Sequence, residues 1–219
     1  MTPSRRLFVA VFLYAATLGP AIAGPLLFDG SWKEQGFLRL WSNEYQFLGT
    51  KLDVTSDGTV SLVWRALEPS LRNADGARWT WEVREGVVGT DLRRKGGDDR
   101  NLAVYFVFTD VETAHNLSRN SARRLLRNQK THALVYVWGG NHNSGSFLKS
   151  PYHPRMITRV LRPSGVGRHI EDVDLEADFH TAFGAEKSIL VGIGVSADSD
   201  DTGGRILASI ENLELVAEQ

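Results

Sequence analysis

Short runs of β-forming residues, separated by turn sequences rich in Ser, Asn, Asp and Gly, constrain the fold of this chain more than any other feature. Continuous apolar runs, typical of central strands covered on both faces, occupy residues 102–109, 132–138 and 189–197. Shorter or alternating runs occupy residues 60–64, 79–83, 156–161, 173–179 and 206–216, and the last of these contains a predicted bulge. About eight or more strands with so little helix predict an all-β fold, a jelly roll or β-sandwich of mostly antiparallel strands.

One amphipathic segment interrupts the strand pattern. Residues 118–130 begin at Ser118, a suitable N-cap, and place Leu125 and its apolar neighbours on one side with arginines on the other. We therefore expect one short surface helix over residues 118–130, and a further helical turn at residues 179–184.

The N-terminus has the three parts of a secretory signal peptide. Arg5 and Arg6 precede the apolar residues 7–18, and the small residues of Ala21-Ile22-Ala23 follow. The apolar run is about 12 residues, too short for a membrane-spanning helix of about 20. We expect residues 1–23 to be a signal peptide cleaved after Ala23, and residues 24–219 to form a single β-sandwich domain. The mature protein would be periplasmic or secreted, without a transmembrane anchor.

Composition excludes several classes of function. The chain has no Cys, which rules out thiol catalysis and Cys-ligated metal sites. Its 25 Lys and Arg balance 26 Asp and Glu, whereas nucleic-acid binders usually carry a basic excess. We therefore expect no nucleic-acid partner. The hydrolase elbow, the P-loop and the His-Glu-x-x-His zinc motif are also absent from the sequence.

Four carboxylates alternate with apolar residues late in the chain: Asp172, Asp174, Glu176 and Asp178. On a strand over residues 173–179 they would all point to one face. The cations that could oppose them on the preceding run are Arg155, Arg159 and Arg162. The pattern favours a solvated acidic face. A charged cleft whose paired carboxylates hydrolyse a glycosidic bond is the alternative.

Aromatic side chains with polar tips indicate a ligand-binding face. Tyr136 and Trp138 share one face of residues 132–138, Tyr105 belongs to a neighbouring run, and Tyr152 follows in a loop. Such rings beside Asp and Arg suit stacking on sugars and hydrogen bonding to hydroxyl groups. We expect Trp138 and Tyr152, at strand–loop junctions, to be exposed. The candidate ligand-binding residues are Asp98, Asp99, Tyr105, Tyr136, Trp138, Tyr152, Arg155, Arg159 and Asp178.

Two acidic turns add oxygen ligands. Asp98 and Asp99 directly precede a buried run. We favour a role in capping the turn; the alternative is a carboxylate at the rim of the sheet that binds sugar hydroxyl groups or acts as an acid or base. A second turn resembles the start of a calcium loop, with oxygen side chains at positions 1, 3 and 5, which are Asp198, Asp200 and Thr202. Position 12 is Ser209, which excludes an EF-hand. The turn is either a calcium contact of another kind or, as we favour, a polar hairpin in which Asp side chains bond the backbone.

Five segments, taken in order, resemble a family of secreted bacterial proteins catalogued as domain of unknown function 3047. They are Gly97-Asp98-Asp99 with the run after it, residues 133–138, Ser150-Pro151-Tyr152, residues 171–184 and residues 191–203. The resemblance covers most of the chain from about Trp64 onward. It implies an exported β-sandwich similar to the galactose-binding-like proteins, with no assigned activity. Around Glu171 the sequence departs from the family pattern, so the resemblance assigns no role there.

Three functions fit these observations, because a β-sandwich can host any of them. The first, which we favour, is a non-catalytic protein that binds a polysaccharide, an oligosaccharide or another envelope component. The second is a jelly-roll glycoside hydrolase or polysaccharide lyase, for which Arg159, Tyr136 and His142 would be the lyase candidates. The third is a structural or protein-binding periplasmic module. No cofactor is certain, and calcium is a possible one.

Overall fold

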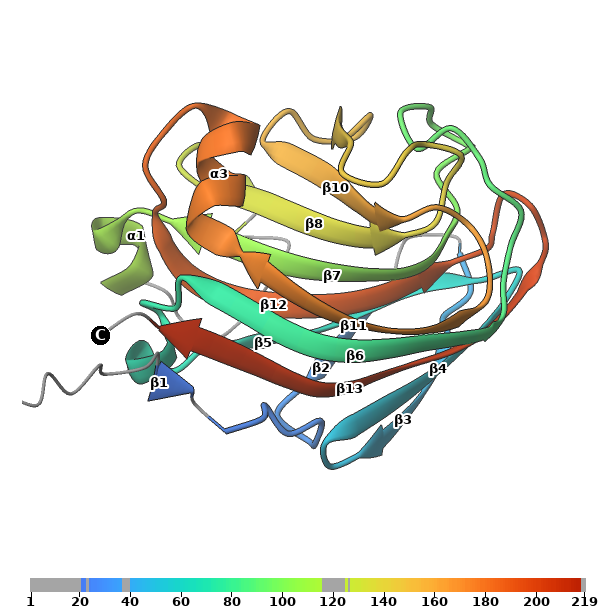
Figure 1. Ribbon diagram of the computed structural model, residues 1–219, viewed down its shortest axis with the longest axis horizontal. Helices are drawn as coiled ribbons and strands as arrows, with labels where there is room; N and C mark the ends of the chain where they lie inside the picture. Colours follow the sequence, from blue (N-terminus) through green and yellow to red (C-terminus); the bar gives the residue numbers. More distant parts are fainter. Residues whose placement is uncertain (1–20, 23, 37–39, 116–124, 126, 218–219) are drawn as a thin grey trace, which may run out of the picture.

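The strand-forming runs pair into two sheets that pack face to face (Figure 1). The computed structural model describes residues 21–22, 24–36, 40–115, 125 and 127–217. The larger sheet has the order β2 (Lys33–Gly36), β5 (Val60–Ala66), β12 (Ile189–Asp198), β7 (Arg100–Thr109), β8 (His132–Trp138), β10 (Met156–Arg162) and β9 (Phe147–Lys149). The smaller has the order β11 (Gly167–Asp174), β6 (Gly76–Glu85), β13 (Arg205–Ala217), β4 (Lys51–Asp57) and β3 (Glu44–Leu48), with β1 (Ala21–Ile22) beside β13.

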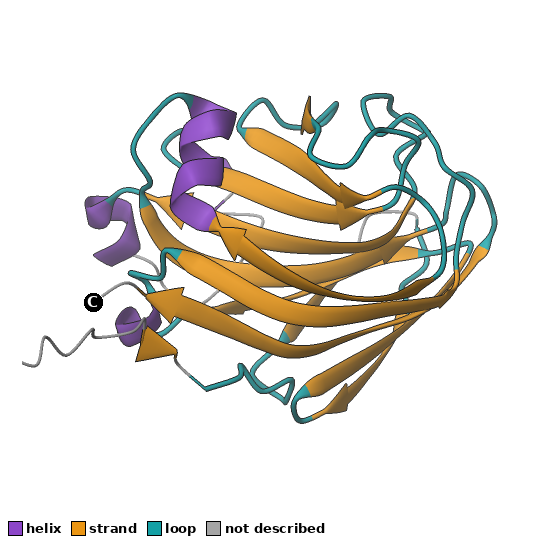
Figure 2. Cartoon of the chain, in the orientation of Figure 1, coloured by secondary structure: helices purple, strands orange, loops and turns teal. Residues whose placement is uncertain are grey.

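The architecture is the predicted β-sandwich. Every pairing between these strands is antiparallel except that of β8 with β10, which is parallel. Strands predominate over helices throughout the described chain (Figure 2). The bulge predicted for residues 206–216 is present, because the register of β13 with β6 shifts between Glu211 and Glu214 and Asn212 has a φ of 51°.

Alternation along the strands builds the interior. On β8, Leu134, Tyr136 and Trp138 belong to the core between the sheets, whereas Val135 and Val137 belong to a second cluster on the outer face. The inner side chains of both sheets join one large apolar cluster, which includes Trp79, Trp81, Phe106, Val195 and Ile210. The larger sheet therefore has an outer face that is also apolar.

One predicted strand is wrong. Residues 173–179 span the end of β11 and the first half of the helix α3 (Leu175–Phe183). The helix begins there because the Asp174 carboxylate accepts a hydrogen bond from the backbone N–H of Ala177 at 2.9 Å. It ends at Gly184, whose φ of 64° suits a residue without a side chain. The four alternating carboxylates therefore do not line one strand face.

The other helices are short. α1 (Val111–His115) follows β7, and a single 3₁₀ turn covers Pro69–Leu71. The predicted turn at residues 179–184 is the second half of α3. The predicted helix over residues 118–130 falls largely outside the described residues, and so does the predicted signal peptide, except that Ala21 and Ile22 form β1. None of the described helices is long and apolar enough to cross a membrane.

Candidate functional site

A groove of about 550 Å³ lies on the outer face of the larger sheet. Side chains from alternate positions of the central strands form its floor, including Leu62, Trp64, Val107 and Val135. Their neighbours along each strand point the other way, into the core. A concavity of this size is typical of small-molecule sites.

Glycine shapes the floor at β12. Gly194 lies opposite Trp64 on β5 and opposite Tyr105 on β7. A Cβ atom at this position would stand 2.8 Å from Cδ1 of Leu62, so the missing side chain makes room for Leu62 to lie across the strand. The centre of the floor is therefore aliphatic, and the rings of Trp64 and Tyr105 lie beside it.

One end of the groove is polar and is organised by Arg100 at the start of β7. Arg100 and Asp198 are cross-strand partners, and Nη1 of Arg100 lies 3.0 Å from Oδ2 of Asp198. The same nitrogen donates to the backbone carbonyl of Asp98 at 2.8 Å and to Oδ2 of Asp98 at 3.2 Å. Nη2 donates to the hydroxyl of Tyr105 at 2.8 Å. The guanidinium therefore fixes two carboxylates and a tyrosine at the rim.

Tyr152 stands at this end with its ring open to solvent. It is 58% exposed, which confirms that prediction, and its hydroxyl donates to Oδ1 of Asp98 at 2.8 Å. The ammonium of Lys95 lies 5.6 Å from the ring centroid. Partial burial and the hydrogen bond to Asp98 raise the pKa of Tyr152 to about 12. The hydroxyl therefore stays a donor at neutral pH and fixes the ring in place.

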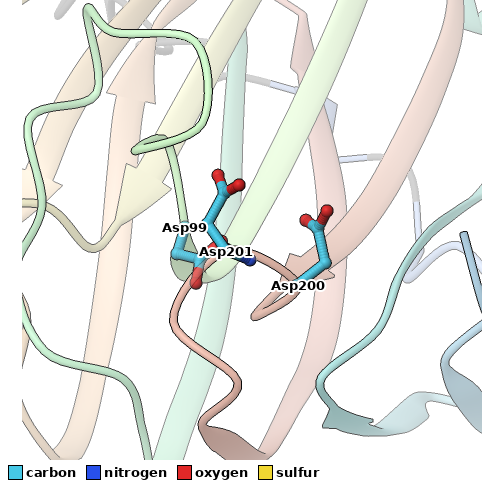
Figure 3. A group of neighbouring side chains, drawn as sticks. All are labelled: Asp99, Asp200 and Asp201. Carbon is cyan, nitrogen blue, oxygen red and sulfur yellow. Dashed lines mark hydrogen bonds between the residues drawn. The ribbon is translucent and has the colours of Figure 1, made fainter.

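The loop after β12 is closed by Asp99. Its carboxylate is buried and accepts hydrogen bonds from the backbone N–H and the hydroxyl of Thr202, at 2.8 and 2.6 Å, and from the N–H of Asp201 at 3.3 Å. Carboxylate oxygens of Asp99, Asp200 and Asp201 lie within 4.8 Å of one another (Figure 3). The sequence predicts Thr202 as a metal ligand, but in the structure its hydroxyl donates a hydrogen bond to the carboxylate of Asp99.

Asp198 is the most perturbed acid at this end. Its Oδ1 atom is buried and has no hydrogen-bond partner among the described residues. Burial, followed by the nearby carboxylates of Asp200 and Asp98, raises the pKa of Asp198 to about 9 although Arg100 opposes the shift.

Three of the predicted ligand-binding residues instead form a polar cluster away from the groove. The buried Tyr136 hydroxyl donates to Oδ2 of Asp178 at 2.6 Å, and Arg159 pairs with the same oxygen. The cluster joins β8, β10 and α3. Arg155 does line the groove, but its guanidinium donates to the backbone carbonyls of Thr131 and Asn128, at 3.1 and 3.2 Å.

The prediction that Trp138 is exposed is wrong. The residue is 2% exposed because β11 and β6 of the opposite sheet cover it. Its ring centroid lies 5.6 Å from that of Trp81 and 5.0 Å from that of His169. A residue at the end of a strand is still buried when the strands of the facing sheet extend far enough to cover it.

Sequence reasoning missed Arg100 and the floor of the groove. Arg100 is a charged residue that opens an apolar run directly after two aspartates, and this position was the available signal. Gly192 and Gly194, two residues apart on β12, were the signal for an open floor. Of the predicted residues, the structure brings together Asp98, Asp99, Tyr105, Tyr152, Asp198 and Asp200.

The fold and the groove define a jelly-roll β-sandwich with an open outer face on its larger sheet. The chain belongs to a family described as "Protein of unknown function (DUF3047)", whose model matches residues 30–214. No curated protein sequence matches it significantly.

Several solved structures are similar to this chain at low sequence identity. A meso-active, thermo-stable cellulase derived from Cel12A of Rhodothermus marinus is 12% identical, covers 90% of this chain and 99% of its own, and has a TM-score of 0.50. The xyloglucanase domain of NopAA from Sinorhizobium fredii is 13% identical over 87% of this chain and 95% of its own, with a TM-score of 0.47. A family 11 carbohydrate-binding module from Clostridium thermocellum is 9% identical over 93% and 98%, with a TM-score of 0.42. The likeness to the cellulase, at a TM-score of 0.50, bears on the fold alone.

Proposed function

We propose that the protein binds a neutral saccharide in the groove without altering it chemically. The observation that carries this proposal is the polar end, where the exposed ring of Tyr152 stands beside the carboxylate of Asp98. A sugar offers an apolar ring face for an aromatic side chain and hydroxyl groups for hydrogen bonds at its edge. The ring of Tyr152 and the carboxylate of Asp98 supply both kinds of partner at the same end of the groove.

The charge at this end favours a neutral ligand. Asp98, Asp198, Asp200 and Asp201 line the groove together with the guanidinium groups of Arg100, Arg127 and Arg155. Carboxylates accept hydrogen bonds, whereas sugar hydroxyl groups can donate them. A uronate would bring a further negative charge to the same place, and like charges brought together at a binding surface cost affinity. This end therefore suits hydroxyl-rich neutral sugars better than acidic ones.

Replacing Tyr152 with alanine is expected to weaken saccharide binding about tenfold, because a ring contact of this kind contributes about 1 kcal/mol or more. Isothermal titration with neutral oligosaccharides, and with uronates for comparison, measures the change. Phe47→Ala is the matched control, since Phe47 is 40% exposed on β3 of the other sheet. We expect it to bind as the wild type does.

Equal losses of saccharide affinity in Tyr152→Ala and Phe47→Ala would contradict the proposal. So would tighter binding of uronates than of neutral oligosaccharides by the wild type. Release of new reducing ends during the titration would instead identify a glycoside hydrolase. This second candidate is favoured by one observation, the raised pKa of Asp198 beside the carboxylate of Asp200, since such an enzyme needs a protonated acid near an ionised one.

The N-terminal sequence supports a second part of the proposal, that the protein acts outside the cytoplasm. The charged, apolar and small-residue regions of residues 1–23 are those of a cleavable signal. Expression of the full chain in a Gram-negative host is expected to yield a periplasmic or secreted protein whose intact mass corresponds to a chain that begins at Gly24. A cytoplasmic protein that retains residues 1–23 would contradict this.

A further inference from the structure

The groove changes in polarity along the direction of its strands. Arg100 of β7 and its cross-strand partner Asp198 lie at the polar end. Val107 lies seven residues further along β7, which places it about 23 Å from Arg100 on an extended strand. Both Arg100 and Val107 line the groove. The groove therefore extends well beyond the charged groups that the proposed function uses.

The part of the groove far from the charges is apolar across four neighbouring strands. It is formed by residues that oppose one another in the register of the larger sheet: Gly192 on β12, Val107 on β7, Ala133 on β8 and Met156 on β10. All four line the groove, and we call them the apolar row. Neighbouring strands are about 4.8 Å apart, so the apolar row is about 14 Å wide. None of its side chains contains a nitrogen or an oxygen atom.

Between the apolar row and the polar end, the groove is apolar and partly enclosed. Val135 of β8 lines the groove but is only 2% exposed. Leu92, from the segment between β6 and β7, packs into the same outer cluster as Val135 and forms a wall. Gly194, on the neighbouring part of the floor, adds no side chain. A ligand in this recess therefore meets apolar atoms from the floor and from the wall.

A saccharide alone does not match the apolar row. Its hydroxyl groups would lose water there without finding a hydrogen-bond partner on any of the four side chains, and such burial is costly. An alkyl chain has no polar group to satisfy, and each methylene group that it buries is favourable. The carboxylates of Asp98 and Asp198 at the other end disfavour an anionic group there. The two ends of the groove thus suit two chemically different parts of one ligand.

We propose that the ligand of the groove is an amphiphile, with a neutral, hydroxyl-rich head at the polar end and an alkyl chain over the apolar row. An alkyl glycoside or a glycolipid has both parts. That the head is a saccharide rests on the proposed function. The alkyl site rests instead on the apolar row and on the wall formed by Leu92.

The first experiment varies the alkyl chain while the head stays constant. Methyl, hexyl and octyl β-maltoside are titrated into the purified protein by isothermal titration calorimetry, each below its critical micelle concentration. The affinity is expected to rise about three- to fourfold for each methylene group that is buried. The heat-capacity change of binding is expected to become more negative with chain length, because apolar surface is buried.

The second experiment places a hydroxyl group in the apolar row. Val107→Thr keeps the branched shape of the side chain, and is expected to reduce the gain in affinity from methyl to octyl maltoside about tenfold. Val166→Thr is the matched control, since Val166 is 66% exposed in the connection between β10 and β11. We expect it to keep the full gain. Far-UV circular dichroism and the melting temperature show that each variant is folded.

A fatty acid of the same chain length tests the head. Arg155 also lines the groove and directly precedes Met156 of the apolar row, so octanoate is the alternative source of an alkyl chain. Octyl maltoside is expected to bind more tightly than octanoate. Equal or tighter binding of octanoate, lost in Val107→Thr, would support the alkyl site and refute the proposed function.

Two other results would overturn the alkyl site. One is an affinity that does not change from methyl to octyl maltoside, and the proposed function would then stand if neutral oligosaccharides still bind. The other is an equal loss of the gain in Val107→Thr and Val166→Thr, because the chain would then bind elsewhere on the protein.

Discussion

The Trp138→Ala variant is expected to lose about 3–5 kcal/mol of unfolding free energy, as is usual when a large aromatic side chain is removed from a core. Trp138 is 2% exposed and contacts the rings of Trp81 and His169 across the two sheets. The vacated volume cannot close without moving both sheets, because interiors of this kind are close-packed. Urea denaturation followed by circular dichroism measures the loss.

Trp41→Ala is the matched control for this experiment. Trp41 is 81% exposed, so its removal is expected to change the free energy of unfolding by no more than about 0.5 kcal/mol. If Trp138→Ala does not fold, Trp138→Phe keeps the comparison measurable with a smaller cavity. If a Trp138 variant kept the wild-type stability but no longer bound saccharide, the interior role of this residue would be contradicted. Trp138 would then be a ligand-binding residue, as predicted from the sequence.

The second large effect is expected for Asp178→Ala, which should lower the free energy of unfolding by about 3–5 kcal/mol. The substitution removes the partner of a buried hydroxyl, Tyr136, and of a largely buried cation, Arg159. Burial and the carboxylate of Asp178 raise the pKa of Tyr136 well above its usual range, so its hydroxyl group remains a donor that needs an acceptor. Thermal and urea denaturation at pH 7 measure the effect.

Asp172→Ala is the control, since the ion pair of Asp172 with Arg78 lies on the surface. The side chains of Arg78 and Asp172 are 41% and 61% exposed, and pairs of this kind contribute about 0–1 kcal/mol. Similar losses in the two Asp variants would mean that the cluster of Tyr136, Arg159 and Asp178 does not hold α3 against the sheet.

The strands could be predicted from sequence where apolar and polar residues alternate or an apolar run is continuous. Residues 132–138 are a strand at the predicted bounds. The same run shows why the site could not be fully predicted. Both faces of β8 are apolar, with Val135 and Val137 on one and Tyr136 and Trp138 on the other. Periodicity separates the two faces, but only the position of the second sheet decides which one becomes core.

The failure at residues 173–179 has a different physical cause. Leu175 and Phe179 are four residues apart, which suits a helix face, while the neighbouring carboxylates also fit the period of a strand. The cap made by Asp174 and the stop at Gly184 decide between the two patterns, and both are local signals that a search for alternation overlooks. The acidic end of the groove was partly predictable, because Asp98 and Asp198 each lie beside a strand end.

The positions of β12 and β13 within the two sheets determine when each sheet can be completed during folding. These are the last two strands along the chain, yet β12 lies between β5 and β7 and β13 lies between β4 and β6. Asp198 thus pairs with Val60, far earlier in the sequence. Each sheet remains two separate halves until its late strand arrives, and pairings between such distant segments form slowly. Neither sheet can therefore be completed until the last part of the chain has been synthesised.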